Sequence, residues 1–179
     1  MFSKVLAFGL GALAIVRAAP AFSFQTPMLL CDANFATSVS PTKSFSTIEP
    51  GVYRIYNEAY GLHDQLRSYR IDDPIFVARS REEPGPFGIW RVETSGNPDA
   101  NEYTLINLGL NAGAHADSQG QIVAGKGDTF AIESAGHGTF VIKVPNDNKV
   151  WTVDTRLLKA PVYLKGEDGV ATGWRFERL

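Results

Sequence analysis

Large apolar side chains alternate with polar ones along residues 51–57, whose sequence is Gly-Val-Tyr-Arg-Ile-Tyr-Asn. This period of two is typical of a half-buried β-strand, because successive side chains of a strand point to opposite faces. The pattern returns twice downstream, each time with an aromatic ring at the same place. The three aligned aromatic residues, spaced by 50 and 37 positions, are Tyr53, Tyr103 and Phe140. A pattern that recurs in this way indicates an internal repeat.

A second alternating motif follows each copy of the first and begins with Trp90, Phe130 and Trp174. Glycine, proline, asparagine and aspartate divide each repeat into four short segments with strand character. The expected strands are 52–56, 62–66, 75–78 and 89–93, then 102–107, 112–116, 121–124 and 129–133, and finally 139–144, 149–153, 162–165 and 174–178. Twelve short strands in three pseudo-repeats predict an all-β domain that closes on itself as a β-trefoil, with the aligned aromatic rings in its core.

The start of the chain differs from the repeats. Residues 1–21 contain Lys4, an apolar run and then Ala19 and Ala21 at the small-residue positions of a cleavage site. This order predicts a signal peptide and hence a secreted protein. Residues 22–48 are rich in serine, threonine and proline and have no sustained period, so they form an N-terminal arm. The β-trefoil domain is expected at residues 49–179.

Net charge and cysteine content limit the binding partners and the covalent links that can be expected. After removal of residues 1–21, 15 basic and 19 acidic side chains remain, which disfavours nucleic acid and anionic membranes as partners. Cys31 is the only cysteine, so no intrachain disulfide can form; it is an idle buried thiol, a free thiol or a link between chains. We expect a monomer whose core alone supplies stability.

Residues for catalysis are sparse. His63, His115 and His137 have no partner at metal-ligand spacing. The acids that close each repeat, Glu93, Glu133 and Glu177, would lie far apart around a threefold barrel and cannot form a general acid–base pair. The sequence therefore predicts a protein that is not an enzyme and needs no cofactor or metal.

Four motifs, taken in order, resemble the β-trefoil protease inhibitors of mushrooms; they are Pro50-Gly-Val-Tyr-Arg-Ile55, Trp90-Arg-Val92, Tyr103-Thr-Leu105 and Trp174-Arg-Phe176. The resemblance covers about residues 49–179. It implies a secreted fungal protease inhibitor that acts through exposed loops on a rigid barrel. One branch of that family inhibits trypsin-like serine proteases, and the other, mycocypin-like branch inhibits cysteine proteases.

The loop after the second expected strand is similar to the one that carries the basic specificity residue in the serine protease branch. Its candidate protease-binding residues here are Arg67, Ser68, Tyr69 and Arg70. A trypsin-like protease reads a basic side chain through the aspartate of its specificity pocket. The alternative is that both arginines are solvated charges paired with Asp72 and Asp73.

Two further readings remain open. Asn111 ends a Gly-Leu-Asn loop similar to the one that cysteine protease inhibitors present to asparagine-specific (legumain-type) endopeptidases. In the same branch, a second loop at residues 57–61 would help to block papain-type enzymes. A β-trefoil lectin that binds carbohydrate is the alternative from another class. The Gln-x-Trp signature of ricin-type lectins is missing, because Gly88 and Thr172 stand where glutamine is required, although other trefoil lectins lack it too. A secreted effector with an unknown partner is the third reading.

Overall fold

The computed structural model describes residues 47–60, 64–79, 82–95, 101–166 and 171–179. The predicted signal peptide, nearly all of the predicted arm, Cys31 and His63 lie outside these residues. No helix in the described ranges is long and apolar enough to cross a membrane.

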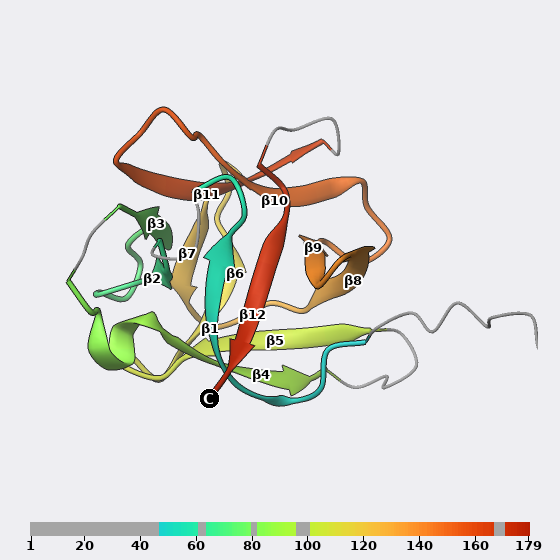
Figure 1. Cartoon of the computed structure of the whole chain (residues 1–179), viewed down its shortest axis with the longest axis horizontal. Helices are drawn as coiled ribbons and strands as arrows, with labels where there is room; N and C mark the ends of the chain where they lie inside the picture. The colour runs from blue at the N-terminus through green and yellow to red at the C-terminus, as the bar shows by residue number, and fades with distance from the viewer. Residues whose placement is uncertain (1–46, 61–63, 80–81, 96–100, 167–170) are drawn as a thin grey trace, which may run out of the picture. The chain divides into compact units, whose positions relative to one another are not determined.

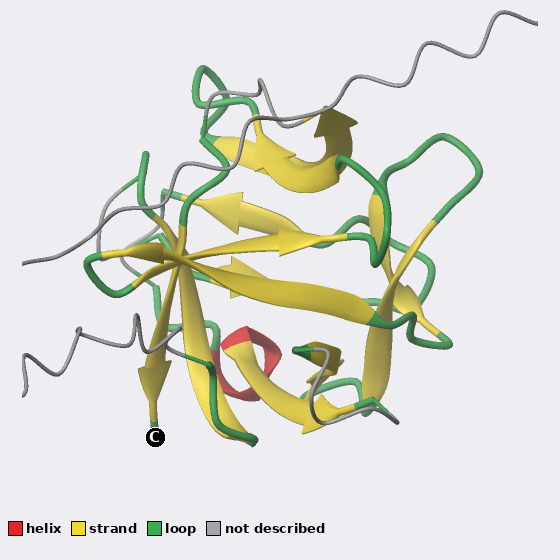
Figure 2. Ribbon diagram, turned by 90° about the vertical axis from the view of Figure 1, so that its right-hand side faces the viewer, coloured by secondary structure: helices red, strands yellow, loops and turns green. Residues whose placement is uncertain are grey.

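The described residues form twelve β-strands and one turn of 3-10 helix, η1 (Gly85–Gly88), which Figure 2 shows in red. The strands are β1 (Gly51–Asn57), β2 (Leu66–Arg67), β3 (Phe76–Ala78), β4 (Ile89–Thr94), β5 (Glu102–Asn107), β6 (Ala112–Ala116), β7 (Ile122–Gly125), β8 (Phe130–Gly136), β9 (Thr139–Lys143), β10 (Lys149–Val153), β11 (Lys159–Gly166) and β12 (Trp174–Arg178). The prediction of an all-β domain with three groups of four strands is confirmed. The largest difference is β2, which was expected over 62–66.

Six strands form a closed ring of antiparallel pairs. Going around it, β1 pairs with β4, β4 with β5, β5 with β8, β8 with β9, β9 with β12, and β12 with β1. Figure 1 shows the last strand, β12, lying beside the first, β1. Because every strand of the ring has two neighbours, the barrel exposes no unpaired edge.

The other six strands form three hairpins, β2–β3, β6–β7 and β10–β11, which together make a cap. Strand β3 pairs with β11, and isolated bridges join Pro74 to Val123 and Gln121 to Tyr163. Each hairpin therefore contacts the other two, as expected for a threefold arrangement.

The aligned aromatic residues meet as cross-strand pairs at equivalent places in the three repeats. The pairs are Tyr53–Trp90, Tyr103–Phe130 and Phe140–Trp174, and all six side chains are buried. Two of the indole N–H groups donate to the backbone of the cap, Trp90 Nε1 to the carbonyl of Leu66 (2.9 Å) and Trp174 Nε1 to that of Trp151 (3.2 Å). The predicted aromatic layers are thus the core of the barrel.

Candidate functional site

Each repeat meets the next at a junction of the same construction. The loop that follows the first strand of one repeat packs against the segment that precedes the fourth strand of the repeat before it. We name the three junctions by the repeats they join. Loop 107–111 lies in the first–second junction, loop 144–149 in the second–third junction and loop 57–60 in the third–first junction.

Hydrogen bonds of the Asn107 side chain and of the amide that follows it close the first–second junction. The buried Asn107 donates from Nδ2 to the carbonyl of Phe87 (2.8 Å), and its Oδ1 accepts from the Leu110 amide (3.1 Å). The next amide, that of Leu108, donates to the carbonyl of Ile89 (2.9 Å). The asparagine side chain and the amide after it together latch the loop onto the preceding repeat.

The same latch closes the third–first junction. Asn57 donates from Nδ2 to the carbonyl of Ala171 (2.9 Å) and accepts at Oδ1 from the Ala59 amide (3.1 Å). The Glu58 amide donates to the carbonyl of Gly173 (3.0 Å). Asn57 is fully buried, like Asn107.

The second–third junction cannot form this latch. Val144 occupies the place of the asparagine and has no side-chain donor, and Pro145 follows it and has no amide hydrogen. The turn itself is kept, because the Asp147 amide donates to the carbonyl of Val144 (3.2 Å) as the Tyr60 amide does to that of Asn57 (3.1 Å). Asp147 is therefore the counterpart of Tyr60.

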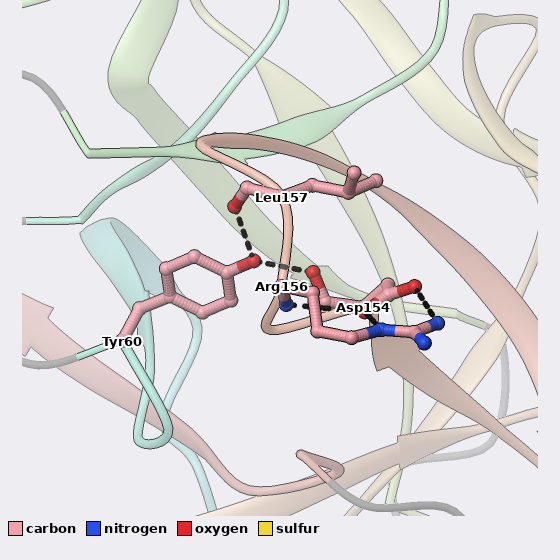
Figure 3. A network of polar contacts seen from close by, with 4 residues as sticks. All are labelled: Tyr60, Asp154, Arg156 and Leu157. Carbon is pink, nitrogen blue, oxygen red and sulfur yellow. Dashed lines mark hydrogen bonds and ion pairs between the residues drawn. The ribbon is translucent and has the colours of Figure 1, made fainter.

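Aromatic rings fill the two latched junctions. In the third–first junction the Tyr60 hydroxyl shares its proton between the carbonyl oxygens of Asp154 (2.5 Å) and Leu157 (2.8 Å), as Figure 3 shows. Burial raises the pKa of this hydroxyl, and the guanidinium of Arg79 lies 5.0 Å from the ring centroid. In the first–second junction Phe87 packs against Tyr69, with ring centroids 5.4 Å apart.

In the second–third junction neither loop 144–149 nor residues 126–129 contain an aromatic side chain, and a cleft of about 580 Å³ opens there. We call it the inter-repeat cleft. Its walls come from both repeats and from the cap, namely residues 116–120 and 128–130, Val144, Asp147, Lys149 and Leu164. The lining combines apolar side chains with three carboxylates and an ammonium group.

Backbone hydrogen bonds orient two of these carboxylates. Asp117 accepts at Oδ1 from the amides of Gln119 and Gln121, both at 2.8 Å. Asp128 accepts at Oδ2 from the Ala116 amide (2.9 Å). Since a carboxylate can accept about four hydrogen bonds, each keeps capacity for a ligand donor.

Cations balance part of the negative charge in the cleft. Lys149 Nζ lies 3.7 Å from Asp147 Oδ2, and Lys126 Nζ lies 3.7 Å from Asp128 Oδ1. With Asp117 added, the lining has a surplus of acceptors and of negative charge, which disfavours an anionic ligand. In the described ranges no three histidine, cysteine, aspartate or glutamate side chains lie close enough together to hold a metal ion.

The predicted protease-binding loop divides into a buried half and an exposed half. Arg67 is only 3% exposed and Ser68 is fully buried, whereas Tyr69 is 45% exposed and the side chain of Arg70 is 79% exposed. The expectation that Arg67 could enter a protease pocket is therefore corrected. Arg67 belongs to β2, pairs with Phe76 and donates from Nε to the carbonyl of Gln65 (3.3 Å), so its side chain is held within the fold.

Arg70 remains as the accessible basic residue of this loop. Its Nε lies 3.7 Å from Asp73 Oδ2, which is the pairing expected if the arginine is a solvated surface charge. The backbone turns at Ile71 and Asp72, and Asp72 adopts a left-handed conformation with a φ of 63°. The loop tip is thus a tight turn rather than an extended segment.

Both loops singled out in the sequence reach the same aromatic ring. The Ser68 amide donates to the carbonyl of Phe87 (3.1 Å), and the Gly109 amide donates to that of Pro86 (3.0 Å). A Cβ at Gly109 would come within 2.5 Å of Phe87 Cδ1, so only glycine permits this approach. Asn111 is exposed beyond this contact, with a φ of 51°. The structure therefore brings both Tyr69 and the Asn111 loop into contact with Phe87.

The inter-repeat cleft was not found by sequence reasoning. The available signal was the substitution of Val144-Pro145 for the asparagine and the amide-bearing residue of the other two repeats. This difference acquires meaning only when the loops are aligned through the junctions they form.

No family model and no curated protein matches the chain. Solved structures do match it over about three quarters of its length. A mosquitocidal holotoxin has a TM-score of 0.62 at 15% identity, over 74% of this chain and only 18% of the toxin. The Rhizoctonia solani agglutinin has a TM-score of 0.61 at 17% identity, over 74% of this chain and 97% of the agglutinin. The Macrolepiota procera ricin B-like lectin, solved in complex with lactose, has a TM-score of 0.60 at 20% identity, over 74% of this chain and 99% of the lectin.

These likenesses confirm the β-trefoil fold. They do not extend to the protease inhibitor family or to a fungal origin, and at these identities they define the fold alone.

Proposed function

We propose that this protein is a non-catalytic carbohydrate-binding β-trefoil that takes a neutral glycan into the inter-repeat cleft. The main observation is the broken symmetry of the junctions. Two are latched and filled by an aromatic ring, whereas the third has no latch and no aromatic residue in the loop or in the segment before β8. Its volume of about 580 Å³ is within the range of about 300–1,000 Å³ found for small-molecule sites.

The chemistry of the lining suits a sugar. Hydroxyl groups can donate to the carboxylates of Asp117 and Asp128, and the ammonium of Lys149 can donate to ring and hydroxyl oxygens. The C–H face of a pyranose can pack on Val144 and Leu164. Because the two carboxylates are already held by backbone amides, little side-chain entropy is lost on binding.

The solved structures add support for the ligand class only. Two of the similar proteins are called a lectin and an agglutinin, and one of them was solved with lactose. The signal peptide expected at residues 1–21 would deliver a binding protein of this kind to glycans outside the cell.

A glycan array probed with the purified protein tests this proposal. The decisive variant is Asp147→Tyr, because Asp147 is the counterpart of Tyr60 and a ring there would fill the cleft. We expect it to abolish binding of the best neutral glycan while the melting temperature is retained. The matched control is Asn148→Tyr, which adds the same ring at an exposed neighbouring position that does not line the cleft. Unchanged binding by Asp147→Tyr would refute the assignment of the site.

Protease inhibition is the second candidate, and the exposed tip at Arg70 and Ile71 favours it. The tip is held on both sides, by the Ser68 amide on Phe87 and by the Asp72 amide on the carbonyl of Ala124 (2.8 Å). If a trypsin-like protease is inhibited, Arg70→Ala should weaken the complex by about 2–4 kcal/mol, as expected for the loss of a buried arginine anchor. Asn111→Ala should be silent in that assay and should matter only for an asparagine-specific cysteine protease. Absence of inhibition of both enzyme classes at micromolar concentration would remove this candidate.

A further inference from the structure

A second, smaller pocket lies where the β2–β3 loop meets β11. Its volume is about 140 Å³, and its lining consists of Tyr69, Asp73, Pro74, Phe76, Lys159 and Pro161. We call it the cap pocket. It combines two aromatic rings, two rigid proline rings, one carboxylate and one ammonium group.

The Tyr69 ring packs against two other aromatic rings and is still partly exposed to solvent. Its ring lies 6.0 Å from that of Phe76 and 5.4 Å from that of Phe87, tilted against both, and yet the residue is 45% exposed. An exposed tyrosine would normally lose side-chain entropy when a ligand fixes it. Here the two neighbouring rings fix it in advance, which leaves a preformed aromatic surface.

Charged groups flank this surface. Lys159 Nζ lies 4.0 Å from the centroid of the Phe76 ring, a cation–π contact that places the ammonium in the pocket. On the loop side Asp73 is positioned by its backbone, since its carbonyl accepts from the Ala124 amide (3.2 Å). The pocket therefore offers the Lys159 ammonium as a hydrogen-bond donor and the Asp73 carboxylate as an acceptor beside the rings of Tyr69 and Phe76.

We infer that the cap pocket is a second carbohydrate site, which takes a single pyranose with its C–H face on Tyr69 and its hydroxyl groups on Asp73 and Lys159. A neutral pyranose has the matching chemistry, because it presents an apolar face and an edge of hydroxyl groups that both donate and accept. The small volume limits the ligand to one ring. This inference rests on the proposed function for the class of ligand, and it adds a separate place of binding.

The cap pocket and the inter-repeat cleft open from different faces of β11. Pro161 lines the pocket and Leu164 lines the cleft, and residues three positions apart on a strand point to opposite faces. One short glycan cannot occupy both. A chain with two such sites can bridge two glycans, and its avidity for a glycan-coated surface then exceeds the affinity of either site.

Titration of the isotope-labelled full chain, followed by amide chemical shifts, tests the inference. The probes are the methyl glycosides of glucose, galactose, mannose and N-acetylglucosamine. We expect at least one of them to shift the amides of Tyr69, Asp73, Phe76 and Lys159 in a saturable manner. Shifts confined to Gln119, Asp128 and Lys149 would overturn the second site and leave the proposed function standing. Shifts at neither place would overturn both.

Variants separate stacking from charge. Tyr69→Ala should weaken binding at the cap pocket about tenfold or more, whereas Tyr69→Phe, which keeps the ring, should stay within about threefold. Ile71→Ala is the matched control, because it truncates an exposed side chain of the same loop that does not line the pocket. Tyr69→Ala should also lose agglutination of sugar-coated beads while the cleft amides still respond. Equal binding by Tyr69→Ala and the unmodified chain would refute the role of the ring.

Discussion

Phe130 is the one position of the aromatic core layer at which the three repeats differ in hydrogen bonding to the cap. Phe130 takes the place that Trp90 and Trp174 take in the other repeats, and only the tryptophans can donate to the cap. Trp90→Ala should cost about 3–5 kcal/mol of unfolding free energy as the truncation of a fully buried ring. Trp90→Phe copies the second repeat and should cost about 1–2 kcal/mol, chiefly for the lost bond to Leu66. Urea unfolding followed by circular dichroism measures both, and equal costs would contradict this account.

Tyr56 gives the fold a dependence on alkaline pH. Its side chain is 7% exposed and donates to Glu177 Oε2 (2.7 Å); burial, followed by this hydrogen bond, raises the pKa of Tyr56 to about 12. In the unfolded chain the pKa is about 10, so between pH 10 and 12 the native state binds more protons than the unfolded state. Stability should therefore be complete below pH 10 and fall as pH rises toward 12. In Tyr56→Phe the urea midpoint should fall less steeply over this interval; an unchanged slope would show that other groups cause the loss.

The alternation of apolar and polar residues predicts burial in the barrel strands but not in β2. The inward positions of the barrel strands could be predicted, because one face of each strand meets the core and the period of two survives. Strand β2 has no such alternation, because its two residues, Leu66 and Arg67, are both buried. A charged residue at the end of a short apolar segment therefore looks like loop, and the burial of Arg67 could not be predicted.

Among the elements, the asparagine latch of each loop should contribute measurably to the free energy of unfolding. Asn107→Val copies the natural Val144 of the third repeat into a junction that depends on the asparagine. The variant leaves the amide of Leu110 without its partner and the carbonyl of Phe87 with the Ser68 amide alone, so it should cost about 1–3 kcal/mol. Asn57→Val should cost a similar amount, because it breaks the same two bonds in the third–first junction. Thermal unfolding of the two variants would decide, and a loss below about 0.5 kcal/mol in both would mean that the latch does not hold the junction.

The inter-repeat cleft could not be predicted because it opens where loop 144–149 lacks the hydrogen bonds that the other two loops make to the preceding repeat. The latch joins a loop of one repeat to a segment of another, so no local pattern of residues describes it. The repeats are spaced by 50 and 37 positions, and this difference lies in the loops rather than in the strands. Strand patterns therefore align the core and leave the loops, which carry the candidate sites, unaligned.

At the scale of the whole molecule, the topology followed from the repeat, while the function did not. Three copies of a four-strand unit have few ways to close, and the pairing of β12 with β1 completes the ring. The same barrel accommodates unrelated activities, because ligands are bound by loops that the core does not constrain. Resemblance in core motifs therefore gave the fold correctly and gave no reliable choice between an inhibitor and a lectin.

Closure of the ring leads to a last prediction about folding. Five residues of β1 pair with β12, the Leu179 amide donates to the carbonyl of Val52 (2.9 Å), and Arg178 forms an ion pair with Glu49. The two ends of the domain thus lie side by side, and a short glycine–serine linker can join Leu179 to Ile48. The β8–β9 turn is a suitable place to open the chain, because Gly136 and Gly138 have positive φ and nothing lies near their Cα atoms on the side-chain side.

We expect a circular permutant that begins at Gly138 and ends at His137 to fold into the same barrel. All six ring strands keep both neighbours, and only the covalent link between β8 and β9 is exchanged for one between β12 and β1. Its unfolding free energy should lie within about 2 kcal/mol of that of residues 48–179 in their natural order, since the difference in loop-closure entropy is small. Circular dichroism and urea unfolding provide the comparison, with binding of the best neutral glycan as a check on the cleft. Aggregation of the permutant would show that folding requires the covalent β8–β9 hairpin. The order in which the ring strands are connected would then matter for closure of the barrel.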